Sequence, residues 1–284
     1  MKILICTIVR NAELTIQRWW ENVTKIATLY PEIEFSISVY ENDSLDNSKN
    51  LLTEVMKDSS AYFSETFLGM EDIDTQFYQS VVNDNRVDNL ARARNNCFNQ
   101  VNNLEEYDYA FSVEVDTHFT VSSLGLLFQK IGQWDILSLT SYTEPSLNPS
   151  PFYDHWATRL TDKEDMWDNE ITEDVPLFKS PLSSLHPKTL VSNKIDAILP
   201  VYATFNLLCL YRMKPILEGC RFSGYSERLE SFDCDTTVIC EQFHQAGYHK
   251  IGMMPHIEVF NDPFYEIAPQ TPLSPTPRTE NCCN

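Results

Sequence analysis

Glycine is scarce in this chain, which has only seven glycines among 284 residues. None of them lies near Arg10, which follows the first apolar run of the chain. Nucleotidyltransferases that make sugar nucleotides normally open with a Gly-rich, basic phosphate loop, so this scarcity disfavours that class. Basic residues are also few, because 21 Lys and Arg stand against 41 acids and give a net charge of -20. No stretch is dense in Lys or Arg, which argues against nucleic acid as a partner and against binding to anionic membranes.

Long apolar runs are missing as well. The opening sequence MKILICTIVR is too short in its apolar part for a secretory signal or a membrane helix, and no later run has the length to span a bilayer. We therefore expect a soluble, cytoplasmic protein with no membrane span. The eight cysteines include no Cys-x-x-Cys pair, which favours buried free thiols over a zinc or disulfide framework.

Hydrophobic residues make up 43% of the chain, enough for a sizeable core. Apolar β-branched runs alternate with segments of helical spacing, and this order predicts an α/β fold with a parallel layer. The predicted strands are 2–9, 34–40, 107–116, 134–142 and one that ends near residue 260; the predicted helices are 11–30, 44–58, 88–104, 122–133 and one after residue 234.

One domain is expected over residues 1–265, in two halves at about 1–140 and about 141–265. Six prolines interrupt residues 144–187, which predicts a long irregular loop region. The Pro-, Ser- and Thr-rich tail at 266–284 is expected to be disordered.

Polar or charged side chains follow three of the predicted strands. They are Arg10 and Asn11, then Glu41, Asn42 and Asp43, then Glu114, Asp116, Thr117 and His118. In an open α/β sheet, ligands bind beyond the carboxyl ends of the strands, so these groups should share one edge. An Asp or Asn there can accept hydrogen bonds from a uracil or guanine edge or from a ribose. A solvated strand end is the alternative reading for each group taken singly.

The sequence FSVEVDTHFT, residues 111–120, carries two acids one residue apart. If the strand continues to its tip, alternation places Glu114 and Asp116 on the same face. Such a pair can hold a hard divalent ion through oxygen ligands and leave positions open for phosphate. This pattern predicts a metal–phosphate site.

Four segments resemble glycosyltransferases of the GT-A fold, which has a Rossmann-type, mixed but mainly parallel sheet flanked by helices. KILICTIVRNAE resembles their opening strand and loop, VYENDSLDNS their nucleotide-holding turn, and NLARARNN the start of a helix that supports the donor. YDYAFSVEVDTHF resembles the strand that leads to their D-x-D metal motif, here E-V-D. The order of the motifs along the chain matches that of the fold.

A closer resemblance is to the fungal capsule-associated α-1,3-mannosyltransferases, family 69 of the glycosyltransferases. It rests on the END tripeptide, the long gap before WDILSLTSY, the segment PFYDHWATR, and the block SFDCDTTVICEQFHQAGYHKIGMMPHIEV. The resemblance covers residues 1 to about 262. It implies that the half at about 1–140 binds the nucleotide-sugar and that the half at about 141–265 binds the acceptor. Members of that family usually carry a membrane anchor, and no such segment is recognised here.

The resemblance implies roles for individual residues. The donor would be bound by Arg10, Glu41, Asn42, Asp43, Arg94, Asn95, Tyr153 and Arg159, and Mn²⁺ or Mg²⁺ would be held by Glu114, Asp116 and His256. The candidate catalytic acids are Asp154, Glu230, Asp233 and Asp235. In an inverting enzyme one of these acids would be the general base. The mannosyltransferase resemblance implies retention, which needs no such base, and the sequence leaves both open.

Taken together, these features indicate a metal-dependent glycosyltransferase that moves a sugar, possibly mannose, from a GDP- or UDP-sugar to a glycan or other hydroxyl acceptor. The alternative is a catalytically inactive nucleotide-sugar-binding or interaction module on the same fold. A metal-dependent hydrolase built on Asp116 and His118 is disfavoured, because no second cluster of His and acids is evident.

Overall fold

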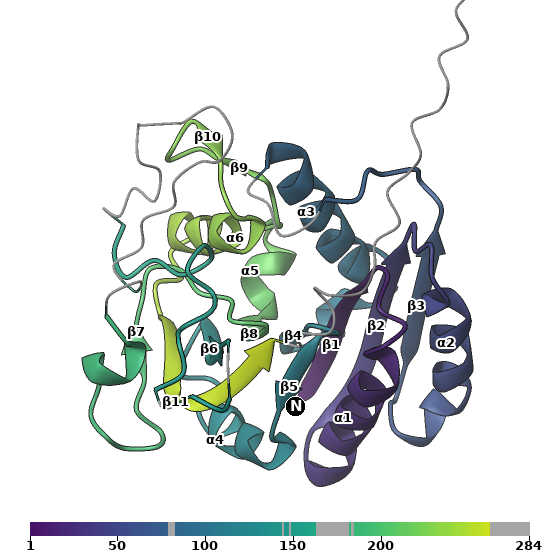
Figure 1. Ribbon diagram of the computed structural model, residues 1–284, viewed down its shortest axis with the longest axis horizontal. Helices are drawn as coiled ribbons and strands as arrows, with labels where there is room; N and C mark the ends of the chain where they lie inside the picture. Colours follow the sequence, from purple (N-terminus) through teal and green to yellow (C-terminus); the bar gives the residue numbers. More distant parts are fainter. Residues whose placement is uncertain (79–82, 144, 148, 163–181, 183–184, 262–284) are drawn as a thin grey trace, which may run out of the picture.

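The computed structural model describes residues 1–78, 83–143, 145–147, 149–162, 182 and 185–261 (Figure 1). The strands are β1 (Lys2–Val9), β2 (Glu34–Asn42), β3 (Thr66–Glu71), β4 (Tyr109–Val113), β5 (Thr117–Phe119), β6 (Ile136–Tyr142), β7 (Leu199–Pro200), β8 (Leu208–Arg212), β9 (Tyr225–Ser226), β10 (Ser231–Phe232) and β11 (Ile251–Asn261). The α-helices are α1 (Ile16–Leu29), α2 (Ser48–Val55), α3 (Asp84–Asn99), α4 (Leu124–Phe128), α5 (Met213–Leu217) and α6 (Asp235–Gln245). Short 3₁₀ helices are η1 (Met56–Ala61), η2 (Leu104–Glu106), η3 (Val121–Ser123) and η5 (Pro187–Leu190).

A nine-stranded sheet in the order β3-β2-β1-β4-β8-β6-β11-β5, with β7 paired to β11, organises the described part of the chain. The strands β3, β2, β1 and β4 pair in parallel, as do β6 and β11. The strands β8, β5 and β7 run antiparallel to their neighbours. The prediction of a mixed, mainly parallel α/β sheet flanked by helices is therefore confirmed.

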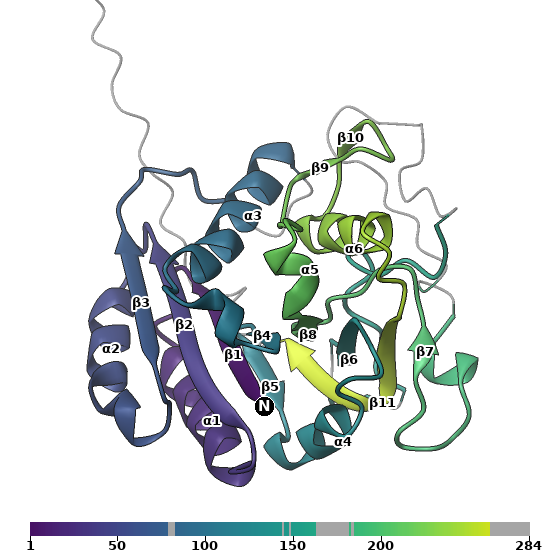
Figure 2. The ribbon, with the colours of Figure 1, turned by 180° about the vertical axis from the view of Figure 1, so that it is seen from behind.

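Helices cover both faces of the sheet, and the alternation of β1 shows how. Ile3 and Ile5 point to the side of α1, α2 and α4, whereas Leu4 and Cys6 point to the side of α3, α5 and α6. Because both faces of β1 are covered, its sequence is a continuous apolar run. Figures 1 and 2 show α1 and α2 beside β2 and β3, with α3, α5 and α6 near one another on the other side of the sheet.

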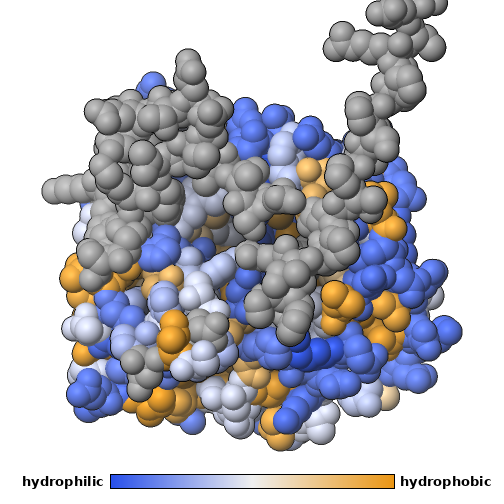
Figure 3. Space-filling model, viewed as in Figure 1, coloured by the Kyte–Doolittle hydropathy of each residue, from blue (hydrophilic) through white to orange (hydrophobic). Residues whose placement is uncertain are grey.

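The strands of the two expected halves share one sheet. β8, from the later half, pairs with β4 on one edge and with β6 on the other. The face seen in Figure 3 is largely hydrophilic outside its grey atoms, with separate hydrophobic areas, as expected for a strongly acidic chain. Within the described residues, every helix is too short or too polar to cross a bilayer.

Three predictions about local structure need correction. No strand is predicted between residues 40 and 107, but β3 lies there and pairs with β2 along its length. The strand predicted at 107–116 ends at Val113. The helices predicted at 44–58 and 122–133 give only α2 and α4, flanked by 3₁₀ turns. The tail at 266–284 and residues 163–181 of the irregular region lie outside the described residues.

Candidate active site

The carboxyl ends of three parallel strands meet at one edge of the sheet. β1 lies between β2 and β4, and the register aligns Val9 with Glu41 and Cys6 with Ser112. The residues that follow these strands, from Arg10, Asn42 and Glu114 onward, are therefore neighbours across the edge. This placement agrees with the rule that ligands bind at this end of an α/β sheet.

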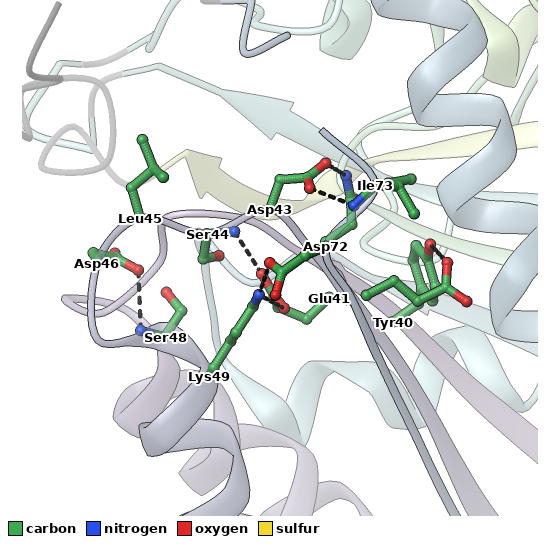
Figure 4. Close-up of polar contacts among 12 residues, drawn as sticks. Tyr40, Glu41, Asp43, Ser44, Leu45, Asp46, Ser48, Lys49, Asp72 and Ile73 are labelled. Atoms are coloured by element: carbon green, nitrogen blue, oxygen red, sulfur yellow. Dashed lines mark hydrogen bonds and ion pairs between the residues drawn. The ribbon is translucent and has the colours of Figure 1, made fainter. Parts of the chain in front are cut away.

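Asp43 organises the first part of this edge. Its carboxylate accepts backbone N–H bonds from Ile73 at 2.7 Å, from Asp74 at 2.9 Å and from Thr75 at 3.0 Å (Figure 4). Burial by itself would raise the pKa of Asp43, but the hydrogen bonds from Thr75, Asn42 and Ile73 hold it well below its usual range. Asp43 is therefore a carboxylate at neutral pH, and it fixes the loop that follows β3.

Arg10 and Asn42 belong to the same cluster. The Arg10 guanidinium donates to the Thr75 carbonyl at 2.6 Å and to the Thr75 hydroxyl at 3.0 Å, and it stacks 5.2 Å from the Phe77 ring centroid. The Asn42 amide donates to Asp43 at 2.9 Å and to the Thr75 hydroxyl at 3.0 Å. The structure thus brings three of the predicted donor-binding residues together around one loop.

The Glu41 side chain points toward the turn into α2 and not toward the loop after β3. It is fully buried, its Oε1 accepts the Ser44 N–H at 2.8 Å, and its Oε2 lies 3.7 Å from Lys49 Nζ (Figure 4). Lys49 also pairs with Asp72. These contacts brace the turn into α2, so any influence of Glu41 on a nucleoside would act through that turn.

Arg94 joins two of the predicted acids. From α3, its Nη1 donates to Glu114 Oε1 at 2.6 Å and its Nε donates to Asp235 Oδ2 at 2.8 Å. The guanidinium lies 4.4 Å from the Phe205 ring centroid, and all three ionic side chains are largely buried. Burial would lower the pKa of Arg94, but Glu114 and Asp235 raise it above its usual value. The bridge ties the end of β4 to the start of α6.

The E-V-D sequence forms a turn and not the end of a strand. Pairing of β4 ceases at Val113, the Glu114 N–H donates to the Leu207 carbonyl at 3.1 Å, and the chain reverses into β5 after Asp116. The reason is that β5 must run antiparallel to β11, with Thr117 opposite Asn261. The alternation of side chains along a strand therefore does not determine where Glu114 and Asp116 point, although both residues follow the end of β4.

A divalent metal fits this tip only with ligands from a substrate. Among the described residues, no group of three or more His, Cys, Asp or Glu side chains is arranged to hold a metal. Glu114 uses Oε1 for Arg94, so a metal at this tip would be held through Glu114 Oε2 and the carboxylate of Asp116. Mg²⁺ is often bound by one or two carboxylates together with substrate phosphates, so this donor set suits an ion that arrives with a diphosphate.

His256 lies elsewhere on β11. Its Nε2 is 2.9 Å from the Ser192 carbonyl, and it precedes by five residues Asn261, the position that faces Thr117. His256 therefore contacts the segment that follows η5, through Ser192, and not the E-V-D turn. Its role as a metal ligand stays a prediction.

The four candidate catalytic acids have different surroundings. Asp233 accepts two bonds from Arg159 Nη2, at 2.7 and 2.9 Å, and both side chains are fully buried. Asp235 is held by Arg94, and Glu230 is exposed. Asp154 is partly exposed, and its Oδ2 accepts the Asn206 N–H at 2.6 Å. Burial raises the pKa of Asp154 to about 6, although nearby N–H groups and arginines oppose this.

Two further predicted donor-binding residues, Asn95 and Tyr153, hold loops near the site in place. Asn95 exchanges two hydrogen bonds with the backbone of Phe222, at 2.9 and 3.1 Å, so it secures that loop. The Tyr153 N–H donates to the Ser141 carbonyl at 2.9 Å and anchors the segment that carries Asp154. Sequence reasoning missed Asn206, whose only signal was a polar residue inside the apolar run ATFNLLCLY.

A mainly parallel α/β sheet with an acidic turn at the tip of β4, an arginine bridge from Arg94 and a loop held by Asp43 agrees with the GT-A fold. The chain belongs to the family described as Cryptococcal mannosyltransferase 1, whose model matches residues 2–242. This membership confirms the resemblance to capsule-associated mannosyltransferases found in the sequence. A search of the curated proteins finds no match.

Solved structures show the same fold. S. aureus TarS 1-349 in complex with UDP-GlcNAc is similar with a TM-score of 0.50 and 12% identity, over 92% of this chain and 58% of that one. The mannosyltransferase PcManGT from Pyrobaculum calidifontis in complex with GDP-Man and Mn²⁺ is similar with a TM-score of 0.50 and 10% identity, over 92% and 56%. This chain thus spans less than two thirds of the length of these structures.

Proposed function

We propose that this protein transfers a sugar, mannose, from a nucleotide-sugar to a hydroxyl group of a glycan acceptor, with Mn²⁺ or Mg²⁺ as cofactor. The observation that carries the proposal is the meeting of Arg10, Asp43, Glu114 and Asp116 at one sheet edge, in a chain of this family. The choice of mannose is supported by the family's description and by the GDP-Man bound to PcManGT.

Asp116 and Glu114 Oε2 would hold the ion, which when bound neutralises charge on the departing nucleoside diphosphate. Arg94 fixes Glu114 through Oε1 and so sets the direction of its other oxygen. Arg10, Asn42 and Asp43 position the loop after β3, which would lie beside the nucleoside end of a bound donor. The acidic surface of the protein does not oppose an anionic donor here, because the ion reverses the local charge.

Asp154 is the acid that we place against the acceptor hydroxyl. Asp233 and Asp235 are committed to buried ion pairs with Arg159 and Arg94, so their carboxylates are already neutralised. Asp154 is partly exposed and has a pKa of about 6, which makes it a hydrogen-bond acceptor at neutral pH. In an inverting reaction it would take the proton of the hydroxyl, and in a retaining one it would orient that hydroxyl.

A thermal-shift panel tests the donor site. GDP, UDP and their sugar conjugates are each added with and without Mn²⁺, and a ligand that binds the folded state raises its stability in proportion to ln(1 + [L]/Kd). We expect a Mn²⁺-dependent shift with GDP-mannose, lost in Asp116→Ala. The matched control is Asp196→Ala, which removes only an exposed carboxylate paired with Lys130. A shift that persists in Asp116→Ala would contradict the assigned metal site.

A further inference from the structure

Residues 206 and 207 form a strained turn just before β8. Asn206 has φ of 57° and Leu207 has φ of 66°, so two successive residues with side chains adopt the left-handed conformation. Asn tolerates this region, but a bulky residue such as Leu seldom enters it. Such a conformation persists only where the surrounding structure enforces it.

The two residues of this turn contact the two sides of the site. The Asn206 N–H donates to Asp154 Oδ2 at 2.6 Å, and the Leu207 carbonyl accepts the Glu114 N–H at 3.1 Å. One strained turn therefore links the acid placed against the acceptor to the acid at the tip of β4.

Buried contacts on every side hold the turn in place. The Asn206 side chain is fully buried; its Oδ1 accepts from the Ser141 N–H at 3.0 Å and the Ser141 hydroxyl at 2.9 Å, and its Nδ2 donates to the Thr204 hydroxyl at 2.8 Å. Leu207 packs in the apolar cluster on the α1 side of the sheet. Ser141 of β6 thus holds the side chain of Asn206. The backbone N–H of Asn206 donates to Asp154, and the backbone carbonyl of Leu207 accepts from Glu114, just after β4.

We propose that the Asn206–Leu207 turn is a positioning element for the transfer reaction, which holds the Asp154 carboxylate at a fixed place relative to Glu114 and so sets the acceptor hydroxyl against the donor. The inference rests on the proposed function and names residues that the motifs of the chain do not include. Its physical basis is that catalytic groups displaced by about 1 Å can cost about 10²-fold in rate.

The charges around Asp154 agree with such a role. Arg94 and Arg159 lower the pKa of Asp154 as cations, and Asp154 in turn acts on the buried thiols of Cys209 and Cys234. The Asn206 N–H favours the ionised carboxylate, so it offsets part of the effect of burial. Loss of this hydrogen bond should therefore raise the pKa of Asp154 further.

Two substitutions at Asn206 separate the turn from the side chain. Asn206→Gly and Asn206→Ala lose the same side-chain hydrogen bonds, but only Gly adopts a positive φ without cost. We expect Asn206→Gly to retain transfer within about 10-fold of the unmodified protein, and Asn206→Ala to lose about 10²-fold in kcat with unchanged nucleotide binding. Gly219→Ala, at φ of 113° with open space around the added Cβ, controls for backbone strain away from the site.

Equal losses in Asn206→Gly and Asn206→Ala would overturn the inference, because the side chain alone would then matter, and so would unchanged activity in both. A second readout does not require transfer at all. The Asp154 carboxyl is titrated by ¹³C NMR in the three proteins and assigned with Asp154→Asn. Agreement between the unmodified protein and Asn206→Gly, with a higher pKa in Asn206→Ala, supports the inference; the same pKa in all three contradicts it. If the unmodified protein shows no transfer, the proposed function fails while this titration still decides the role of the turn.

Discussion

Asp154 shows how burial can set the working pH of a single residue. Its carboxyl titrates with a pKa of about 6, against 3.8 for an ordinary Asp. We therefore expect the transfer rate to fall as the pH drops through about 6, because the protonated acid no longer accepts a hydrogen bond from the acceptor hydroxyl. The measurement is kcat/KM between pH 5 and 8, and Asp154→Asn should be slow at every pH and lack this limb. A limb that survives in Asp154→Asn would assign it to another group.

The same shift affects stability with a defined sign. Because the pKa of Asp154 is higher in the folded state than in the unfolded chain, its contribution favours folding fully below about pH 4 and is lost as the pH rises through about 6. Asp43 behaves in the opposite way, since its lowered pKa contributes stability above the ordinary Asp value that is lost at more acid pH.

For single residues, the sequence allowed candidate side chains to be assigned to strand ends, but it did not reveal which side chains they contact. Arg10, Asp43, Glu114 and Asp116 could be placed at strand ends because parallel strands share an edge. The partners of Arg94 could not be predicted, because Glu114 and Asp235 lie 20 and 141 residues away along the chain. Asn206 was missed because a left-handed turn of Asn and Leu carries no glycine signal.

Among the elements, α6 and the segment leading to it depend on arginines from other parts of the chain. Arg94 holds Asp235, Arg159 holds Asp233, and Arg228 contacts Glu241 at 2.9 Å. Removing one partner of a buried pair leaves an uncompensated charge, which costs about 3–5 kcal/mol. The acids at the start of α6 are therefore part of its support.

We expect Arg159→Met to lower the free energy of unfolding by about 3–5 kcal/mol, since it leaves the Asp233 carboxylate buried without its cation. The double variant Arg159→Met with Asp233→Leu should recover most of that loss, because both charges are then gone. Urea titrations of the two single variants and the double variant measure the coupling. Losses that simply add would show that the pair is not coupled in the folded state.

Long buried strands could be predicted from the sequence, but short strands and the turns that depend on distant pairing could not. β1 and β2 were evident as apolar runs covered on both faces. β3 was missed because its sequence TFLGME is short, only partly buried and bounded by polar residues. The E-V-D turn looked like a strand end because local sequence does not reveal that β5 must pair with the distant β11.

The sheet as a whole interleaves the two halves of the chain. Since β8 lies between β4 and β6, unfolding of either half would remove strand neighbours from the other. We expect tryptophan fluorescence and far-UV circular dichroism to report one coincident unfolding transition in urea. Two separated transitions would indicate halves that fold independently. The position of β8 could not be predicted, because the order of elements along the chain does not determine how strands pair.

Metal-dependent mannosyl transfer is the activity that we propose for this protein, and a transfer assay measures it. The protein is incubated with GDP-mannose and mannotriose in Mn²⁺, and the products are analysed by mass spectrometry, with UDP-sugars and EDTA as parallel conditions. We expect the acceptor to gain one hexose, EDTA to abolish the product, and Asp116→Ala to do the same while Asp196→Ala does not. An unchanged acceptor with every donor, from protein that still binds nucleotide, would contradict the claim and indicate a binding module on the same fold.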